Sequence, residues 1–375
     1  MAFKFLIVTH VQHISKDNDF FGYSPYVNEM NIWNKYCDEV ILVAPLIKED
    51  LNPIYTKYAA KKITFIKIPS FNLTNLKSVV LSFFVIPIII WKLIKSMKMA
   101  DHIHLRCPGN IGLLGSIVQI FFPNKKKTAK YAGNWDPKSK QPLSYRLQKW
   151  ILSNTFLTRN MQVLVYGEWE NQTKNIKSFF TATYREEEVQ NEKCEIRSLE
   201  DKVIQFLYVG TLSKGKQPLY AIQIVEELSN LGKNVKLNLY GEGVLRNEIE
   251  TYILKKGLNS IIILKGNQAK ETVLDAYQNS HFLVLPSKSE GWPKVVAESM
   301  FWGCVPISTP VSCVSYMLDK GNRGIILNQD LDNDVNQIKN LIGNPLSYFQ
   351  ISKNGMQWSR QFTMDKFEIE IKKLL

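Results

Sequence analysis

Short apolar runs alternate with helix-length segments through the first half of the chain. Six runs have the length and apolar character of buried strands: 3–10, 38–45, 62–69, 100–106, 127–133 and 161–167. Helix-length segments separate several of them, at 24–36, 77–98 and 110–122. Strands that alternate with helices form βαβ units, so the pattern predicts a parallel sheet covered by helices on both faces.

The alternation stops within the polar stretch 168–201, which carries the acidic cluster Glu186–Glu188, and then restarts. Further strands are predicted at 202–210, 235–241, 261–266, 281–287, 305–310 and 324–328. Further helices are predicted at 217–231, 244–256, 270–279 and 293–302. The sequence therefore predicts an α/β protein with two doubly wound domains, 1–180 and 202–358. Residues 181–201 would link them, and 359–375 would form an amphipathic C-terminal helix.

Composition agrees with two globular domains and adds a basic character. The 375 residues are 45% hydrophobic and 22% charged, and Lys plus Arg exceed Asp plus Glu by 13. Such an excess favours an anionic partner: nucleic acid, an anionic membrane surface or a phosphorylated substrate. No nucleic-acid-reading module is recognisable, so we expect no nucleic-acid partner. The five scattered cysteines contain no C-x-x-C pair, which favours a reduced, cytoplasmic compartment.

One apolar segment raises the question of a membrane. Val79 to Trp91 is apolar or small throughout and is followed by Lys92, Lys95 and Lys98. It is too short to cross a bilayer, which takes about 20 residues. Two interpretations remain, a helix packed on the sheet and an interfacial helix. The second would place the protein peripherally at the inner face of the cytoplasmic membrane.

The loops after the second-half strands are suited to a ligand. Ligands of open parallel sheets bind at the carboxyl ends of the strands, and here those ends read VGTLSKGK, YGEG, KGNQ, PSKSEGWP and STPVS. Neither the dinucleotide G-x-G-x-x-G fingerprint nor a P-loop is present. Gly291 and Pro293 allow a tight turn into a helix from Lys294, whose first N–H groups would bind phosphate. Glu290 and Glu298 could each accept hydrogen bonds from vicinal hydroxyls. This arrangement fits a nucleotide sugar.

The same stretch resembles the E-x7-E motif of retaining GT-B glycosyltransferases, in particular glycosyltransferase family four. The shared positions are Pro286, Ser287, Glu290, Gly291, Pro293 and Glu298. FLYVGTLSKGK resembles the V-G-R-L-x-x-x-K-G segment of the family, and LNLYGEGVLRNEIE resembles its G-x-G-x-x-x-x-L-E segment. The likeness covers most of 202–328. Two positions depart from the family pattern, with Thr211 in place of an arginine and Gln217 in place of a glycine.

The resemblance implies a fold and an activity. The fold would be GT-B, with two Rossmann-like domains facing a central cleft and the C-terminal helix crossing back to the N-terminal domain. The activity would be retaining, metal-independent transfer of a hexose from a UDP- or GDP-sugar to a glycan or lipid-linked saccharide. The family context is bacterial surface polysaccharide biosynthesis, of capsule or lipopolysaccharide. No cofactor is expected, because the nucleotide sugar is a substrate.

The resemblance also assigns roles to residues. Lys216 would neutralise the departing diphosphate, Glu290 would bind hydroxyls of the donor sugar, and Glu298 would bind the ribose. The backbone amides of Lys294 and Val295 would hold the phosphates. The donor-binding set is Gly210, Thr211, Lys216, Gly241, Glu290, Gly291, Lys294, Val295 and Glu298, and the catalytic set is Glu290, Lys216 and Arg106.

The first half resembles the family less closely. ADHIHLRCPGN resembles the segment in which a strand ends in H-x-H-x-P, with His104 at the first histidine and Arg106 at the second. Arg106 could instead form a buried ion pair, and His104 could be a packed histidine. Gly22 and Trp135 are further acceptor-side candidates, with Trp135 equally well explained as an anchor for its loop.

Two other functions compete with the leading one. A nucleotide-sugar 2-epimerase shares the fold, but the E-x7-E spacing and the upstream V-G-x-L-x-x-x-K segment speak against it. A catalytically weak GT-B subunit that binds nucleotide or glycolipid for a partner enzyme is favoured by Thr211, because one positive charge is missing from the diphosphate site.

Overall fold

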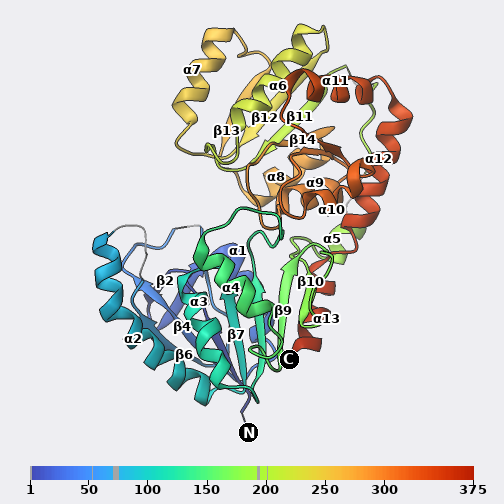
Figure 1. The fold of residues 1–375 in the computed structure, drawn as a ribbon. Helices are drawn as coiled ribbons and strands as arrows, with labels where there is room; N and C mark the ends of the chain where they lie inside the picture. The colour runs from blue at the N-terminus through green and yellow to red at the C-terminus, as the bar shows by residue number, and fades with distance from the viewer. Residues whose placement is uncertain (1, 53, 71–75, 192–194, 201) are drawn as a thin grey trace. The chain divides into compact units, whose positions relative to one another are not determined.

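The computed structural model describes residues 2–52, 54–70, 76–191, 195–200 and 202–375. For residues 76–83, 190 and 191 it describes the backbone alone. Two compact units form. The first contains residues 1–179 and 367–375, and the second contains residues 180–366. The predicted linker, 181–201, lies within the second unit. Figure 1 shows both units.

The first unit is built on a mainly parallel sheet. Its parallel strands are β1 (Lys4–Val8), β4 (Glu39–Ile47), β6 (Ile63–Ile68), β7 (His102–Cys107), β8 (Lys126–Tyr131), β9 (Met161–Tyr166) and β10 (Ile176–Phe179). They follow the order β10-β9-β8-β7-β1-β4, and β6 pairs with β4. An antiparallel extension of β2 (His13–Lys16), β3 (Asp19–Tyr23) and β5 (Tyr55–Lys57) joins β4 through β2.

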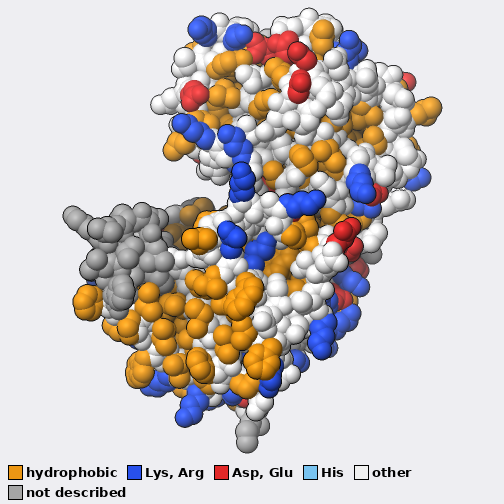
Figure 2. Space-filling model, viewed as in Figure 1, with side chains coloured by type: hydrophobic (Ala, Val, Ile, Leu, Met, Phe, Trp, Pro, Cys, Tyr) orange, Lys and Arg blue, Asp and Glu red, His pale blue; other side chains and the backbone are white. Residues whose placement is uncertain are grey.

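Helices cover this sheet because one stripe of each is apolar. They are α1 (Ser24–Asn34), α2 (Leu76–Met99), α3 (Asn110–Val118) with the 3₁₀ turn η1 (Gln119–Phe121), and α4 (Leu143–Ser153). Ile89, Leu93 and Met97 of α2 are fully buried and join the core formed by the central strands. Figure 2 shows hydrophobic side chains gathered over α2, α3 and α4 on the surface as well.

The second unit contains a six-stranded, all-parallel sheet in the order β13-β12-β11-β14-β15-β16. The strands are β11 (Ile204–Val209), β12 (Val235–Tyr240), β13 (Ile262–Gly266), β14 (Phe282–Leu285), β15 (Val305–Ser308) and β16 (Ile325–Ile326). The helices are α5 (Glu186–Asn191), α6 (Pro218–Asn230), α7 (Arg246–Lys256), α8 (Lys270–Gln278), α9 (Lys294–Phe301), α10 (Val314–Met317), the 3₁₀ turn η2 (Asp319–Gly321), α11 (Leu331–Ile342) and α12 (Pro345–Ser359). The strand order reverses direction at β11, as in doubly wound folds.

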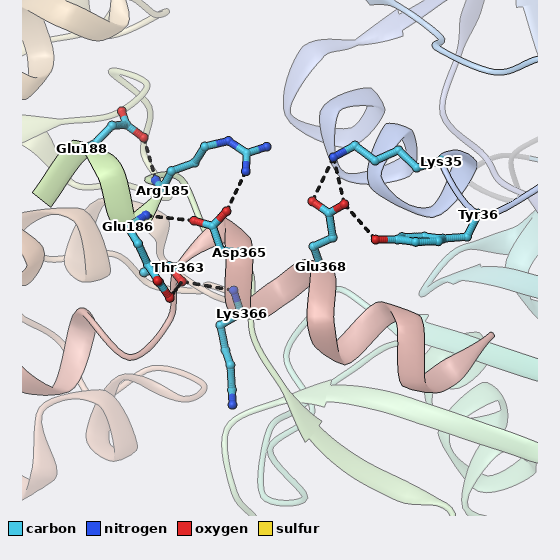
Figure 3. A network of polar contacts seen from close by, with 9 residues as sticks. All are labelled: Lys35, Tyr36, Arg185, Glu186, Glu188, Thr363, Asp365, Lys366 and Glu368. Carbon is cyan, nitrogen blue, oxygen red and sulfur yellow. Dashed lines mark hydrogen bonds and ion pairs between the residues drawn. The ribbon is translucent and has the colours of Figure 1, made fainter. Parts of the chain in front are cut away.

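The last helix, α13 (Met364–Leu374), begins in the second unit and ends in the first. In the second unit, Asp365 accepts hydrogen bonds from the Arg185 guanidinium at 2.7 Å and from the backbone N–H of Glu186 at 2.9 Å (Figure 3). In the first unit, Glu368 accepts hydrogen bonds from Lys35 Nζ and Tyr36 Oη, each at 2.9 Å. Polar contacts therefore hold each end of α13 to the unit in which it lies.

The structure confirms the predicted α/β class with two doubly wound domains, and each predicted strand is present with its ends shifted by a few residues. Several elements were not predicted: the strands β2, β3, β5 and β10, and the helices α4, α5, α10, α11 and α12. Strand β10 lies in the stretch predicted to lack strands, and α11 and α12 lie within 331–359. The predicted helix over 359–375 starts at Met364, because α12 ends at Ser359 and a short turn intervenes.

Candidate functional site

Two glycine loops meet at the carboxyl edge of the second sheet. The backbone N–H of Gly210, after β11, donates to the carbonyl of Tyr240 at 2.9 Å, and that of Gly241, after β12, donates to Gly266 at 2.8 Å. A Cβ atom on Gly241 would collide with the carbonyl oxygen of Gly210, and Gly241 has a φ of +140°. Only glycine fits here. The loop carrying Gly210 and Thr211 is therefore packed directly on the next one.

Lys216 and Glu290 form an ion pair at this edge. Lys216 Nζ lies 2.5 Å from Glu290 Oε1, although the two residues are 74 positions apart in the chain. The Glu290 side chain is 9% exposed and that of Lys216 is 31% exposed, so the pair lies at a partly sheltered surface. The backbone N–H of Lys288 donates to the carbonyl of Gly215 at 2.8 Å, which ties the two loops together. The structure therefore brings the two predicted catalytic residues of this domain into contact.

Beside the ion pair, α9 begins at Lys294 with an open N-terminus. Pro293 precedes it and makes no side-chain cap. Hydrogen bonding to preceding carbonyls begins at Val296, whose N–H donates to Pro293 at 3.0 Å, as expected when the first N–H groups of a helix have no intrahelical acceptor. The turn is fixed at Gly291, whose carbonyl accepts from Ser312 Oγ at 2.9 Å. The positive end of the helix dipole thus adds to the charge of Lys216.

Glu298 is held by two hydroxyl groups. Thr183 Oγ1 donates to Glu298 Oε1 at 2.7 Å, and Tyr277 Oη donates to Oε2 at 2.9 Å. Burial, followed by the charge of Glu298, raises the pKa of Tyr277 well above its usual value, so the phenol remains a neutral donor. Glu298 and Lys294 also line a small recess of about 10 Å³. Each carboxylate oxygen retains a lone pair for a further donor.

Sequence reasoning did not identify Thr183, Tyr277 or Tyr208 as parts of this site. Thr183 lies in the stretch that was interpreted as a linker, and Tyr277 lies near the end of α8, outside every recognised motif. Tyr208 lies on β11 and donates from Oη to the carbonyl of Thr211 at 3.0 Å. Burial, and then the charge of Glu290, raise its pKa. No periodic or spacing signal marks these residues.

Arg106, at the carboxyl end of β7 in the first unit, belongs to a buried charge cluster. Its Nη1 lies 3.8 Å from Glu29 Oε1, and Lys130 Nζ lies 2.8 Å from the same oxygen. The guanidinium carbon lies 5.3 Å from the centre of the Tyr26 ring. The Arg106 side chain is 18% exposed, Glu29 is 8% and Lys130 is 1%. The ion-pair interpretation of Arg106 is therefore realised.

The three acceptor-side candidates are enclosed by protein. His104 is fully buried, and its Nδ1 lies 2.8 Å from Thr128 Oγ1. Trp135 is 1% exposed, and its Nε1 donates to Gln172 Oε1 at 2.9 Å, as a loop anchor would. Gly22 is buried on β3, where a Cβ atom would lie 3.0 Å from Val27 Cγ2. In this conformation none of the three offers a side chain to an acceptor, because neighbouring side chains surround them.

Asp-x-Asp occurs three times in the chain, at 17–19, 330–332 and 332–334, and aspartates of these stretches make local contacts. Asp334, in α11, is fully buried and accepts hydrogen bonds from Tyr220 Oη at 2.6 Å and the N–H of Asn328 at 3.0 Å. Asp19, in the β2–β3 hairpin, pairs with Lys57 at 2.6 Å. Within the described part of the chain, no group of three or more His, Cys, Asp or Glu side chains is arranged to hold a metal ion.

A protein-family model and several known proteins match part of this chain. Residues 189–358 match the family model "Glycosyl transferases group 1". An uncharacterised glycosyltransferase of Methanocaldococcus jannaschii is 28% identical over 152 residues, 40% of this chain and 42% of that protein. An alpha-D-kanosaminyltransferase of Streptomyces kanamyceticus is 25% identical over 147 residues, 38% of each. The matched segment thus spans less than half of these curated relatives.

Solved structures match over nearly the whole chain. Anabaena HepE in complex with UDP has a TM-score of 0.68 at 13% identity, covering 100% of this chain and 99% of that one. WaaG, a glycosyltransferase involved in lipopolysaccharide biosynthesis, has a TM-score of 0.61 at 11% identity, covering 99% and 98%. The fold is GT-B. Residues 189–358, the segment that matches the glycosyl transferases group 1 model, contain the Lys216–Glu290 pair.

Proposed function

We propose that this chain is a retaining glycosyltransferase of family four, which transfers a hexose from a UDP- or GDP-sugar to a glycan or lipid-linked saccharide. The observation that carries the proposal is the Lys216–Glu290 ion pair beside the open N-terminus of α9. A cation, a helix N-terminus and a carboxylate in contact suit a ligand with a diphosphate bonded to a hydroxyl-rich sugar.

The proposed donor would replace the ion pair between Lys216 and Glu290 with contacts to each of the two residues. The diphosphate would lie against the backbone amides of Lys294 and Val295. It would form an ion pair with Lys216, whose pair with Glu290 would then break. Glu290 would then accept hydrogen bonds from sugar hydroxyls, so neither charge is left without a partner. Gly210 and Gly241 let the backbone approach the nucleotide closely, and Glu298 would accept from the ribose. Positive charge from Lys216 and α9 stabilises the diphosphate as it leaves, which is where negative charge grows.

The comparisons support this proposal at the level of substrate class. The HepE structures were determined with UDP, and with UDP-glucose. A matching Campylobacter jejuni enzyme, 27% identical over 168 residues, is named as an N-acetylgalactosaminyltransferase acting on an undecaprenol-linked saccharide. We extend these properties to our chain as a nucleotide-sugar donor and a lipid-linked or glycan acceptor. Surface polysaccharide synthesis at the cytoplasmic face of the membrane is the setting that such an acceptor implies.

Thr211 favours a second candidate function, a subunit that binds nucleotide or glycolipid without efficient transfer. Its carbonyl is held by Tyr208, and its side chain brings no positive charge to the diphosphate. Lys214, on the same loop, and Lys294, the first residue of α9, are alternative cations. Metal-independent transfer therefore depends on whether these lysines replace the missing arginine.

A panel of nucleotide sugars tests donor binding. UDP- and GDP-linked hexoses would be added at increasing concentration, and the thermal midpoint of the protein would be measured. A donor that binds only the folded protein raises the midpoint. At 100 times its Kd it adds about 2.7 kcal/mol to the free energy of unfolding. The same series with EDTA separates metal-dependent from metal-independent binding. If no nucleotide sugar and no free UDP or GDP shifts the midpoint, the proposal fails.

A further inference from the structure

One face of α2 is apolar and exposed although the opposite face is already buried in the core. Phe84, Ile88 and Trp91 are 73%, 50% and 61% exposed, at the spacing of a single helical stripe. Packing on the sheet explains Ile89 and Leu93, which are buried, but it does not explain this outer stripe. One side of this helix therefore packs on the sheet, and the other side is apolar and exposed. The side chains of residues 79–83 lie outside the described ones.

The exposed stripe continues onto neighbouring elements. Helix α3 packs against both α2 and α4, so the three helices lie side by side. Five large apolar side chains on η1, α4 and the following turn are also exposed: Phe121 74%, Leu143 78%, Leu147 45%, Trp150 61% and Phe156 70%. Figure 2 shows hydrophobic side chains spread over this side of the unit. We call these eight residues the apolar face. Exposed apolar surface gathered in this way marks an interaction site.

The stretch of chain that carries the apolar face is predominantly basic. Residues 51–167 contain 18 Lys and Arg but only two acids, Asp101 and Asp136, so the positive excess of the whole chain is concentrated here. Helices α2, α3 and α4 contain no acid at all. Lys95 and Lys98 are exposed and prolong the α2 stripe beyond Trp91. Lys92 and Lys125 are bonded to backbone carbonyls, and the Lys77 side chain lies outside the described ones.

A basic hollow adjoins the apolar face at Phe156. The Arg159 guanidinium carbon lies 4.7 Å from the centre of the Phe156 ring. Arg159 also lines a cavity of about 900 Å³, and none of the lining residues is an acid. The other cations of this cavity are Lys126, Lys127, Lys174, Lys177 and Lys373, of which Lys177 and Lys373 pair with Glu370. An anionic group would thus find positive charge directly beside an exposed aromatic side chain.

We propose that the apolar face docks this unit on an anionic lipid bilayer, with Arg159 and the neighbouring lysines at the lipid phosphates. Tryptophan and lysine beside aliphatic residues are the side chains that favour the membrane–water interface. The basic surroundings select an anionic occupant over a neutral one. No helix among the described residues is long and apolar enough to cross a membrane, so docking would be interfacial. The inference deepens the proposed function, and rests on it only in naming a lipid-linked acceptor.

Vesicle flotation of the purified full chain tests the docking. Wild type is compared with Phe84→Ser/Trp91→Ser/Trp150→Ser on vesicles of phosphatidylcholine alone and of phosphatidylcholine with phosphatidylglycerol. The matched control, Val244→Ser/Leu254→Ser/Leu346→Ser, removes equally exposed apolar side chains from the second unit. We expect at least a tenfold loss of binding to the mixed vesicles in the first variant and none in the control. Equal binding by the two triple variants would overturn the proposal.

Charge reversal tests the choice of occupant. Lys95→Glu/Lys98→Glu/Arg159→Glu should abolish selectivity for phosphatidylglycerol, whereas Lys255→Glu/Lys339→Glu/Lys353→Glu in the second unit should keep it. Wild-type binding should fall as salt is raised. Equal binding of wild type to neutral and anionic vesicles would contradict the proposal. So would a wild-type protein that binds no vesicles but self-associates with rising concentration, if Trp91→Ser abolishes that self-association. Donor binding is measured separately by thermal shift, so failure of docking is distinguishable from failure of the proposed function.

Discussion

The Lys216–Glu290 pair concentrates two opposite charges at one point of the second unit, and each charge has a separate proposed use. Lys216→Ala removes the cation that would meet the leaving diphosphate. We expect transfer to fall by about 10² to 10³, the loss typical of one electrostatic contact to a transition state. Steady-state kinetics with the donor found by thermal shift would measure this effect.

The control for Lys216 is Lys255→Ala, an exposed lysine on α7. It should leave the rate unchanged. Far-ultraviolet circular dichroism should show that both variants are folded, because Lys216 is itself 31% exposed. Wild-type turnover in Lys216→Ala would remove this residue from the catalytic set.

Glu298 is expected to act on binding more than on rate. Its partners, Thr183 and Tyr277, hold the carboxylate near the α9 N-terminus, and its expected ligand is the ribose. A ribose contact is the same in the ground and transition states, so Glu298→Gln should raise KM about tenfold and leave kcat nearly unchanged. Normal donor affinity with collapsed turnover would exchange the roles of Glu290 and Glu298.

The candidate site could be predicted from sequence only where spacing encodes it. Glu290, Glu298 and the glycine loops follow strands whose ends must share an edge, so their meeting with Lys216 is a consequence of topology. Tyr277 and Thr183 reach Glu298 through tertiary packing, which leaves no local pattern. Trp135 shows the opposite case, since an aromatic loop residue looks the same in sequence whether it is exposed or buried.

At the scale of elements, α13 is held to the first unit by acidic side chains. Glu370 Oε2 lies 2.9 Å from Lys177 Nζ on β10, which connects α13 to the sheet, and Oε1 lies 2.6 Å from Lys373 Nζ within α13 itself. Hydrogen bonds from Lys373 and Lys177 lower the pKa of Glu370 to about 2. A carboxylate with a depressed pKa stabilises the fold above its ordinary pKa of 4.5, and this stabilisation is lost as pH falls toward 2.

Glu370→Gln should therefore have a lower thermal midpoint than wild type at pH 7. The difference between the two midpoints should shrink as pH falls from 4.5 to 2, because wild type loses the same ion pairs by protonation. Thermal unfolding followed over this pH range measures the effect. Glu271→Gln, an exposed glutamate at the start of α8, is the control and should behave as wild type at every pH. A constant difference between Glu370→Gln and wild type down to pH 2 would show that the ion pairs are not its cause.

Elements with strong periodicity were predictable, and those without it were not. Buried parallel strands such as β1 and β11 are continuous apolar runs, which sequence reveals directly. Strand β10 is at the edge of its sheet and reads Ile-Lys-Ser-Phe, so half of it is polar. Helix α2 is apolar on both faces. Its hydrophobic pattern therefore cannot show which face packs on the sheet and which face is left exposed.

At the scale of the whole molecule, charge and chemistry are divided between the units. The second unit holds the glycine loops, the Lys216–Glu290 pair and the α9 N-terminus, all of them suited to a nucleotide sugar. The first unit holds the basic segment 51–167 and the apolar face, which suit an anionic surface. A transferase that takes a soluble donor and a lipid-linked acceptor needs both.

Nucleotide release from a radiolabelled donor tests the central claim most directly. Wild type, Glu290→Ala and the control Glu271→Ala would each be incubated with the donor found by thermal shift and an extract containing candidate acceptors. We predict release by wild type and the control at similar rates, and at least about a hundredfold less by Glu290→Ala. Donor binding without release by wild type would instead favour the nucleotide-binding subunit, and undiminished release by Glu290→Ala would contradict the assignment of the site.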